Sequence, residues 1–334
     1  MTIRSLILLF LMLTINWSFG QTTSPDSTYP PPGRLVNIGH RKLHLLCSGK
    51  GSPTVILVAG GGAFSIDWTL VQNSIDSTTR VCSYDRAGLG WSDPGPANET
   101  IEQTVNDLHL LLKKTGEKGP YILVGASIAG IFIQAYQYTY PGEVASLIFT
   151  NSSDRLGLKS KDKIDLIWNL TEQEIKSAYP LPVSVKGYPP SKISEPFNRL
   201  PANMQPIRVW LQMKKWNEWD PTKTTAESQL SWRKEFLREF ETTDFGKKPP
   251  LGNLPVVVIS SGPMANDSIR KYRNGAGARL DFLSSNSLHI TATGSGHEIH
   301  LYQPEIVVQA LKQAVMAVRN GIPLSKVSKQ AEEH

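Results

Sequence analysis

Cysteine is scarce: only Cys47 and Cys82 occur among 334 residues. Two cysteines cannot fill a zinc site, and these two do not form a CxxC redox motif. They are either a disulfide or two small buried hydrophobic residues. We expect no metal centre and no organic cofactor.

Concentrated charge of one sign is also lacking. The formal net charge is +6, but Lys and Arg are scattered and alternate with Asp and Glu, as in residues 161–165. A solvated surface shows this pattern, whereas a nucleic-acid groove gathers basic residues. We therefore expect no nucleic-acid partner.

Long hydrophobic runs are missing as well, since a membrane-spanning helix needs about 20 apolar residues. The run from Leu6 to Leu13 is short, follows Arg4, and precedes small residues at Ser18 and Gly20. This is typical of a cleaved signal peptide rather than a membrane anchor. We predict a signal peptide over residues 1–20, no membrane span in the mature chain, and export to the periplasm or the medium.

The remainder has the composition of a globular domain, because 40% hydrophobic and 19% charged residues suffice for a buried core. A Ser/Thr/Pro-rich stretch over residues 21–33 predicts a linker. Residues 321–334 are expected to form a polar tail. Nothing in the sequence indicates an oligomeric state.

Short apolar runs alternate with amphipathic ones along this domain. Runs that are apolar on both faces suit a parallel sheet covered by helices on each side. Strands are predicted over residues 44–47, 54–58, 80–84, 121–124, 144–150, 254–259 and 288–291.

Two helices have clear ends. One begins at the capping box Thr100 to Gln103 and ends before Gly116, and the other runs from Pro304 to Asn320 and is followed by Gly321. Between them, residues 154–250 are amphipathic, proline-rich, and hold five of the eight tryptophans. We predict one α/β fold, a mostly parallel doubly wound sheet with core halves at 34–153 and 251–320, interrupted by a helical insertion at 154–250.

A serine lies where one buried strand meets the following helix, in the segment Gly125 to Gly130. Such a joint holds the Ser127 hydroxyl above the sheet and requires small neighbours, and the segment reads GxSxA, one methyl away from GxSxG. Ser127 is therefore a candidate nucleophile. The alternative is a serine N-cap on an ordinary strand–helix turn.

A serine nucleophile needs a base, and His297 follows the last predicted strand and a Gly-Ser-Gly turn. In serine-first enzymes of this chain order the histidine belongs there. His300 is near but lacks the preceding Gly-Ser-Gly. His44 and His289 fall within strands, and His109 is expected to face solvent from its helix.

Acyl chemistry also needs two backbone N–H donors for the oxyanion. Ile128, after the nucleophile, is one candidate, and Gly61, in the loop Ala59 to Gly62 after a strand, is the other. A glycine-rich loop could instead bind phosphate, but neither GxGxxG nor GxxxxGK[ST] is complete.

These motifs resemble the α/β-hydrolase fold superfamily and, more narrowly, its secreted bacterial serine ester-hydrolase-like branch. The resemblance rests on Val58 to Gly61, on Tyr84 to Asp93 (YDRAGLGWSD), and on Gly294 to His297. It implies that the insertion is a cap over the site. It also implies that Asp85 and Arg86 hold the loop beside the site and are structural.

The resemblance places the acid of the triad after one of two strands. After 254–259 stands Asp267, a few residues beyond the expected position, and we choose it. After 144–150 stand Asn151, at the strand end itself, and Asp154, which is the substitute. An asparagine can orient a histidine but cannot stabilise an imidazolium by charge.

In this fold the strands of Cys47 and Cys82 are neighbours, so a disulfide forms if their register is right. The function implied is hydrolysis of an ester or related small-molecule acyl substrate by Ser127, His297 and Asp267. Ser127 argues against epoxide hydrolases and dehalogenases of this fold, which use Asp. Amide or proline-peptide hydrolysis and acyl transfer on the same triad are alternatives, and so is a non-catalytic binding protein.

Overall fold

The computed structural model describes residues 28–95, 100–152, 193–218, 251–262, 280 and 283–325. The chain divides into Met1–Pro30 and Pro31–His334, and the elements of the fold belong to the second unit. The predicted signal peptide lies outside the described residues, as does most of the predicted insertion. The domain boundaries therefore stay predictions.

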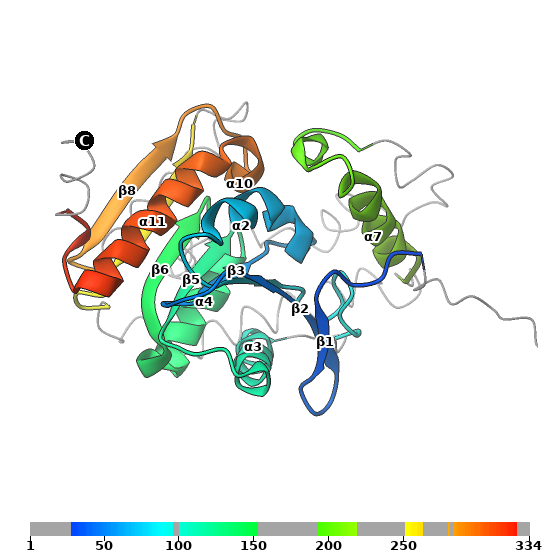
Figure 1. Ribbon diagram of the computed structural model, residues 1–334, viewed down its shortest axis with the longest axis horizontal. Helices are drawn as coiled ribbons and strands as arrows, with labels where there is room; N and C mark the ends of the chain where they lie inside the picture. The colour runs from blue at the N-terminus through cyan, green and yellow to red at the C-terminus, as the bar shows by residue number, and fades with distance from the viewer. Residues whose placement is uncertain are drawn as a thin grey trace, which may run out of the picture. The chain divides into compact units, whose positions relative to one another are not determined.

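Eight strands form one sheet in the order β1-β2-β4-β3-β5-β6-β7-β8 (Figure 1). β1 and β4 each pair with β2 antiparallel, and all other pairs are parallel. The predicted mostly parallel, doubly wound sheet is confirmed. The strands are β1 (Arg34–Asn37), β2 (Lys42–Ser48), β3 (Val55–Val58), β4 (Val81–Tyr84), β5 (Tyr121–Ala126), β6 (Val144–Thr150), β7 (Val256–Ser261) and β8 (Ser287–Ala292).

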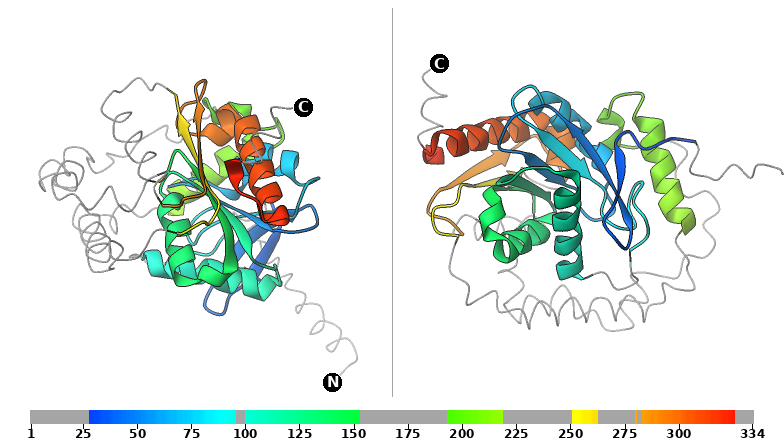
Figure 2. Two further views of the ribbon diagram at one scale, coloured as in Figure 1. Left: turned by 90° about the vertical axis from the view of Figure 1, so that its left-hand side faces the viewer. Right: turned by 60° about the horizontal axis from the view of Figure 1, so that its bottom comes forward.

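Helices cover both faces of this sheet, with α2 and α11 on one side and α3 and α4 on the other (Figures 1 and 2). Their bounds, together with the shorter helical turns, are η2 (Ser65–Trp68), α2 (Thr69–Ile75), α3 (Ile101–Thr115), α4 (Ala129–Thr139), η3 (Pro141–Glu143), η5 (Phe197–Arg199), α7 (Gln205–Glu218), α10 (Ile299–Tyr302) and α11 (Pro304–Asn320).

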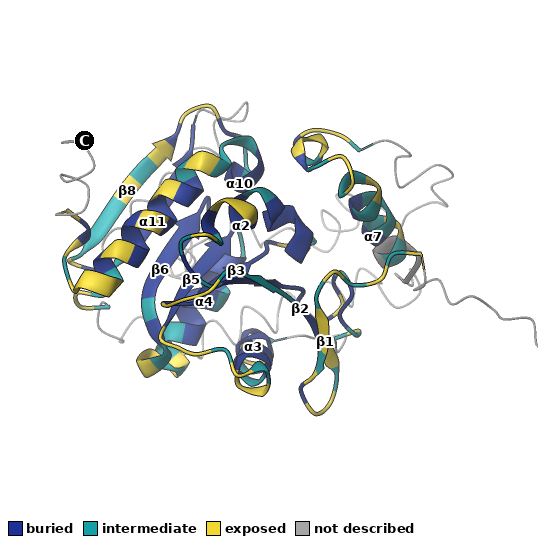
Figure 3. Cartoon of the chain, viewed as in Figure 1, coloured by how far each residue is buried: buried dark blue, intermediate teal, exposed yellow. Residues whose placement is uncertain are grey.

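The central strands are buried on both faces, which explains their unbroken apolar runs. In β5, Ile122 and Val124 pack toward α2 and α11, while Leu123 packs toward α3 and α4. Exposure increases toward the edge strands β1 and β8 (Figure 3). The sheet therefore separates two apolar cores.

Both helices with clear sequence signals begin and end as predicted. Thr100 Oγ1 accepts the Gln103 N–H at 3.1 Å, and Gly116 ends α3 in the left-handed conformation, with φ of 73°. Gly321 ends α11 in the same way, with φ of 61°.

The prediction that His109 faces solvent is wrong. Its ring stacks on Tyr140 with centroids 3.9 Å apart, and its Nδ1 lies 3.1 Å from Glu143 Oε2. Tyr136 also donates to Glu143 Oε2, at 2.6 Å. The end of α4 and the following turn bury this side of α3.

The described part of the insertion contains η5 and α7. Arg208 of α7 donates to Asp67 of η2 at 2.8 Å, and both side chains are buried. The Arg208 guanidinium lies over the rings of Phe64 and Phe197. α7 is thus attached to the segment that follows the glycine-rich loop. Within the described ranges, no helix is long and apolar enough to span a bilayer.

Candidate active site

Ser127 lies at the joint between β5 and α4 in a left-handed conformation, with φ of 54°. Its N–H donates to Thr150 O at the end of β6, at 3.2 Å, and its carbonyl accepts the Gly130 N–H at 3.1 Å. α4 begins at Ala129 after Ile128 and has no side-chain cap. The structure therefore does not support the N-cap alternative, and a strained serine is typical of functional sites.

The joint is crowded at Gly125. A Cβ there would lie 2.8 Å from the Ala129 carbonyl and 2.9 Å from Gly130 N, closer than real Cβ atoms come. Ala129 itself is fully buried and packs in the apolar core, so the extra methyl of GxSxA is one of the core side chains. The departure from GxSxG leaves the joint intact.

The glycine-rich loop after β3 lies against the same joint. A Cβ on Gly60 would be 3.2 Å from Ser127 Cβ, and one on Gly61 would be 3.8 Å from the Ile128 side chain. The structure thus brings the two predicted oxyanion donors, Gly61 and Ile128, to one place.

Arg86 fixes the orientation of this loop. Its guanidinium donates to the carbonyl of Ala59 and, at 3.0 Å, to that of Gly60. Because a trans peptide is planar, with its C=O and N–H opposed, the Gly61 N–H points away from Arg86. This contact agrees with the structural role expected of Arg86.

Asp85 is held in a buried polar cluster. It accepts from His44 Nδ1 at 2.8 Å and from the backbone N–H groups of Ser65 and Trp91. Gly90 has φ of 56°, and a Cβ there would lie 2.0 Å from Asp85 Oδ2. The Asp85 side chain therefore occupies the space that glycine leaves at position 90, and His44 is part of this polar cluster.

His297 stands in the loop between β8 and α10. The side-chain nitrogen of Asn151 lies 3.0 Å from His297 Nδ1 and 3.3 Å from the His297 carbonyl. Asn151 directly follows Thr150, whose carbonyl accepts the Ser127 N–H. Ser127 and His297 are therefore attached to the same end of β6. The predicted acids Asp267 and Asp154 lie outside the described residues.

His300 is not an alternative base. It is fully buried and stacks on Trp68 with ring centroids 4.4 Å apart. Burial, with a smaller contribution from His297, lowers the pKa of His300 to about 3. The ring is neutral at ordinary pH and inaccessible to substrate. His289 is exposed on β8, where its Nε2 lies 2.8 Å from Ser260 Oγ.

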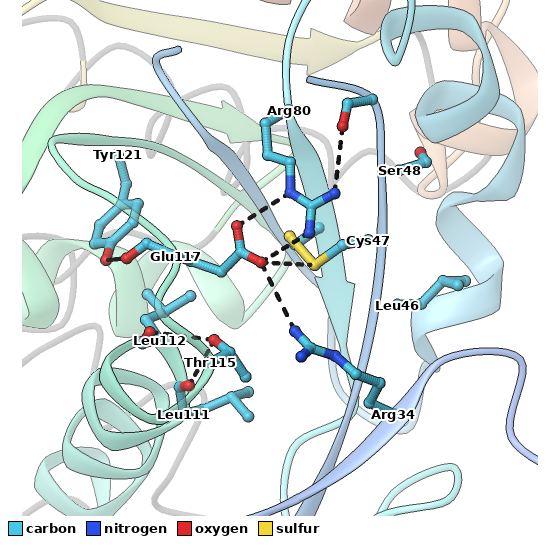
Figure 4. A network of polar contacts seen from close by, with 12 residues as sticks. Arg34, Leu46, Cys47, Ser48, Arg80, Leu111, Leu112, Thr115, Glu117 and Tyr121 are labelled. Atoms are coloured by element: carbon cyan, nitrogen blue, oxygen red, sulfur yellow. Dashed lines mark hydrogen bonds and ion pairs between the residues drawn. A yellow bond between two sulfur atoms is a disulfide. The ribbon is translucent and has the colours of Figure 1, made fainter. Parts of the chain in front are cut away.

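Cys47 and Cys82 face each other in the antiparallel register of β2 and β4, and their sulfur atoms form a disulfide. Glu117 lies beside it, with Oε1 3.7 Å from Cys47 Sγ, and pairs with Arg80 (Figure 4). In the described part of the chain, these two cysteines and Glu117 form the one cluster with metal-ligand atom types. The disulfide leaves no thiolate to bind a metal.

Sequence reasoning missed the contact between Arg208 and Asp67. Burial raises the pKa of Asp67, and Arg208 acts in the opposite direction. Nothing in the sequence signals a partnership between an insertion residue and a side chain 141 positions earlier. Asn151 is visible in the sequence as a polar residue at a strand end, but its contact with His297 is not.

Comparison with known proteins agrees with this fold. The family model described as alpha/beta hydrolase fold matches residues 53–304. The probable transporter efuK of Hormonema carpetanum is 26% identical over 326 residues, which cover 87% of this chain and 44% of that protein. The present chain thus spans less than half the length of that relative.

Solved structures show the same fold at low identity. An esterase of Thermogutta terrifontis superposes with a TM-score of 0.58 at 20% identity, covering 83% of this chain and 94% of its own. An epoxide hydrolase of Bacillus megaterium superposes with a TM-score of 0.56 at 17% identity, covering 84% of this chain and 99% of its own. At such identity the likeness shows the fold alone.

Proposed function

Since this chain belongs to the α/β-hydrolase fold family, we propose that it is a serine hydrolase that cleaves an ester or related acyl substrate through an acyl-enzyme on Ser127. The observation that carries the proposal is the left-handed Ser127 at a strand–helix joint, against which Gly60 and Gly61 lie. A nucleophile and two oxyanion donors are what acyl transfer requires in one place.

The first half-reaction forms the acyl-enzyme. His297 takes the Ser127 hydroxyl proton as Ser127 Oγ bonds to the substrate carbonyl carbon. The carbonyl electron pair moves to oxygen, which accepts hydrogen bonds from the N–H groups of Gly61 and Ile128. Each of these hydrogen bonds stabilises the transition state by about 3 kcal/mol. Collapse of this intermediate breaks the ester bond, and the leaving alcohol takes the proton from His297.

The second half-reaction reverses these roles with water. His297 removes a proton from water, the hydroxyl attacks the acyl carbon, and Ser127 leaves with the proton returned by His297. The carboxylic acid is the second product, and it ionises to the carboxylate by releasing its proton to solvent. Asp267, with Asp154 as its substitute, remains the proposed acid of the triad, and its charge would stabilise the imidazolium that His297 becomes in each half-reaction.

A serine at this joint favours acyl substrates over epoxides, although an epoxide hydrolase is among the structural neighbours. Hydrolases of epoxides on this fold attack with an aspartate, whereas this chain has Ser127 at the joint. Amides and acyl acceptors other than water would use the same residues.

A fluorophosphonate probe tests the nucleophile directly. We expect the wild type and Ser74→Ala, a change at an exposed serine of α2, to be labelled, and Ser127→Ala to remain unlabelled. Hydrolysis of nitrophenyl esters of increasing chain length should fall by about 10⁴-fold or more in Ser127→Ala. A folded wild type that neither reacts with the probe nor cleaves any ester would favour a non-catalytic binding protein.

Export of the mature chain is part of the same proposal. It is supported by the signal-peptide pattern of residues 1–20 and by the Cys47–Cys82 disulfide, because disulfides persist in oxidising compartments. Mass determination of the N-terminus after secretion from a bacterial host tests it, with Gln21 as the expected first residue.

A further inference from the structure

Asn151 makes two contacts with one residue. Its side-chain nitrogen lies within hydrogen-bond distance of both the ring Nδ1 and the carbonyl oxygen of His297. One amide therefore holds the ring and the backbone of the proposed base together. Asn151 itself is buried, and both contacts are partly buried.

The position of Asn151 is itself fixed. Its N–H donates to Ile259 O in β7 at 2.7 Å, which continues the pairing of β6 with β7 beyond the end of β6. Its φ is 46°, a left-handed conformation that asparagine tolerates better than most residues. The amide thus projects from a rigid corner of the sheet rather than from a free loop.

The same corner holds the nucleophile. Thr150 O accepts the Ser127 N–H at 3.2 Å, and Ser152 Oγ donates to Gly125 O at 2.6 Å. Three successive residues, Thr150, Asn151 and Ser152, therefore contact the serine joint on one side and the histidine loop on the other. Displacement of this corner would move Ser127 relative to His297.

We propose that Asn151 is a positioning residue that places His297 relative to Ser127 and whose amide selects the ring nitrogen that carries the proton. This inference rests on the proposed function. An amide nitrogen only donates, so in the arrangement observed Nδ1 of a neutral His297 accepts and its proton resides on Nε2.

A general base of this kind needs the opposite tautomer, with Nδ1–H formed and Nε2 free to accept from serine. Rotation of the Asn151 amide by half a turn places Oδ1 against Nδ1–H and gives up the bond to the His297 carbonyl. Formation of the reactive tautomer therefore loses one hydrogen bond. With a carboxylate at this position the reactive tautomer would not require a rotation of the side chain, because both carboxylate oxygens accept.

The test compares Asn151→Gly and Asn151→Asp, both of which tolerate the left-handed backbone, with Asn73→Ala on the exposed face of α2 as the matched control. We expect kcat/KM for a nitrophenyl ester to fall about 10–100-fold in Asn151→Gly, a loss typical of removing the partner that orients a functional histidine.

The pH profile separates positioning from general damage. In Asn151→Asp the acidic limb of kcat/KM should move up by about one pH unit, because a carboxylate beside Nδ1 favours the imidazolium. Asn73→Ala should match the wild type. Wild-type rates and profiles in both Asn151 variants would overturn the inference.

A second measurement does not depend on activity. Nitrogen NMR of labelled histidine above pH 8 should show His297 of the wild type with its proton on Nε2, and Asn151→Asp should move that proton to Nδ1. An unchanged tautomer would overturn the inference even if the enzyme is active. Failure of Ser127 to react with a fluorophosphonate would overturn the proposed function without affecting this result.

Discussion

The two ends of the sheet are built in opposite ways. At the amino ends of the parallel strands, Glu117 accepts from Arg80 Nε at 3.1 Å and Nη2 at 2.8 Å, beside the Cys47–Cys82 disulfide (Figure 4). Bidentate pairing of this kind satisfies both partners in relaxed geometry.

At the carboxyl ends the backbone is strained instead. In the described ranges, the two non-glycine residues with positive φ are Ser127 and Asn151, both just beyond strands of the candidate site. Such conformations cost about 1–3 kcal/mol each and persist only where the surroundings enforce them. The amino end of the sheet thus stabilises the fold, whereas the carboxyl end holds a particular geometry at a cost in stability.

The largest effect is expected from removing the disulfide. It closes a loop over a separation of 35 residues. A cross-link over a loop of this length lowers the conformational entropy of the unfolded chain, which stabilises the folded protein by about 4 kcal/mol. Cys47→Ser with Cys82→Ser should lower the free energy of unfolding by roughly that amount in urea titrations.

The same double variant tests the division between the two ends. Fluorophosphonate labelling per folded molecule should match the wild type, because the disulfide lies at the end of the sheet away from Ser127. Slower labelling of the fully folded variant would show that the two ends are coupled.

An effect of intermediate size is expected from His300. The folded pKa of about 3 lies below the ordinary 6.5, so as pH falls the unfolded chain takes up a proton before the folded one. The stability from His300 is complete above pH 6.5 and is lost as pH falls toward 3, at up to about 1.4 kcal/mol per pH unit.

His300→Phe keeps a ring against Trp68 but does not titrate. Thermal unfolding between pH 7 and 4 should therefore show a shallower fall in Tm for His300→Phe than for the wild type. Between pH 7 and 8 the Tm values of the two proteins should change with pH in the same way. Equal slopes below pH 6 would mean that another group is responsible for the acid sensitivity.

The smallest effect should be a gain in stability. Ser127→Gly removes the strain at φ of 54° and should raise the free energy of unfolding by about 1 kcal/mol. Ser127→Ala is the matched control, because it loses the same hydroxyl but keeps a Cβ. If Ser127→Gly is no more stable than Ser127→Ala in denaturant titrations, the joint is not strained.

The features that the sequence predicts correctly depend on neighbours along the chain. The ends of α3 and α11 are predictable because their caps, Thr100, Gly116 and Gly321, are local signals. The central strands are predictable because burial on both faces makes them uniformly apolar. β1 escapes prediction, since Arg34–Asn37 is a short, largely exposed edge strand with no apolar run.

The features that escape prediction depend on distant pairs. The sequence places His109 in solvent because Tyr140 and Glu143, which cover it, lie on the next helix and turn. Asn151 meets His297 across 146 positions, and from the sequence Asn151 stands only as a poor substitute for an acid. Their meeting is produced by the pairing of β6 with β7 and of β7 with β8, which the local sequence of either segment does not specify.

The disulfide has a topological consequence. The segment from Cys47 to Cys82 contains β3, the glycine-rich loop and α2, and the cross-link makes it a covalent ring. A protease that nicks this ring once leaves both fragments joined, so Gly61, one of the two proposed oxyanion donors, stays attached to the sheet. The loop around Gly61 would therefore stay attached to the sheet after a single cut.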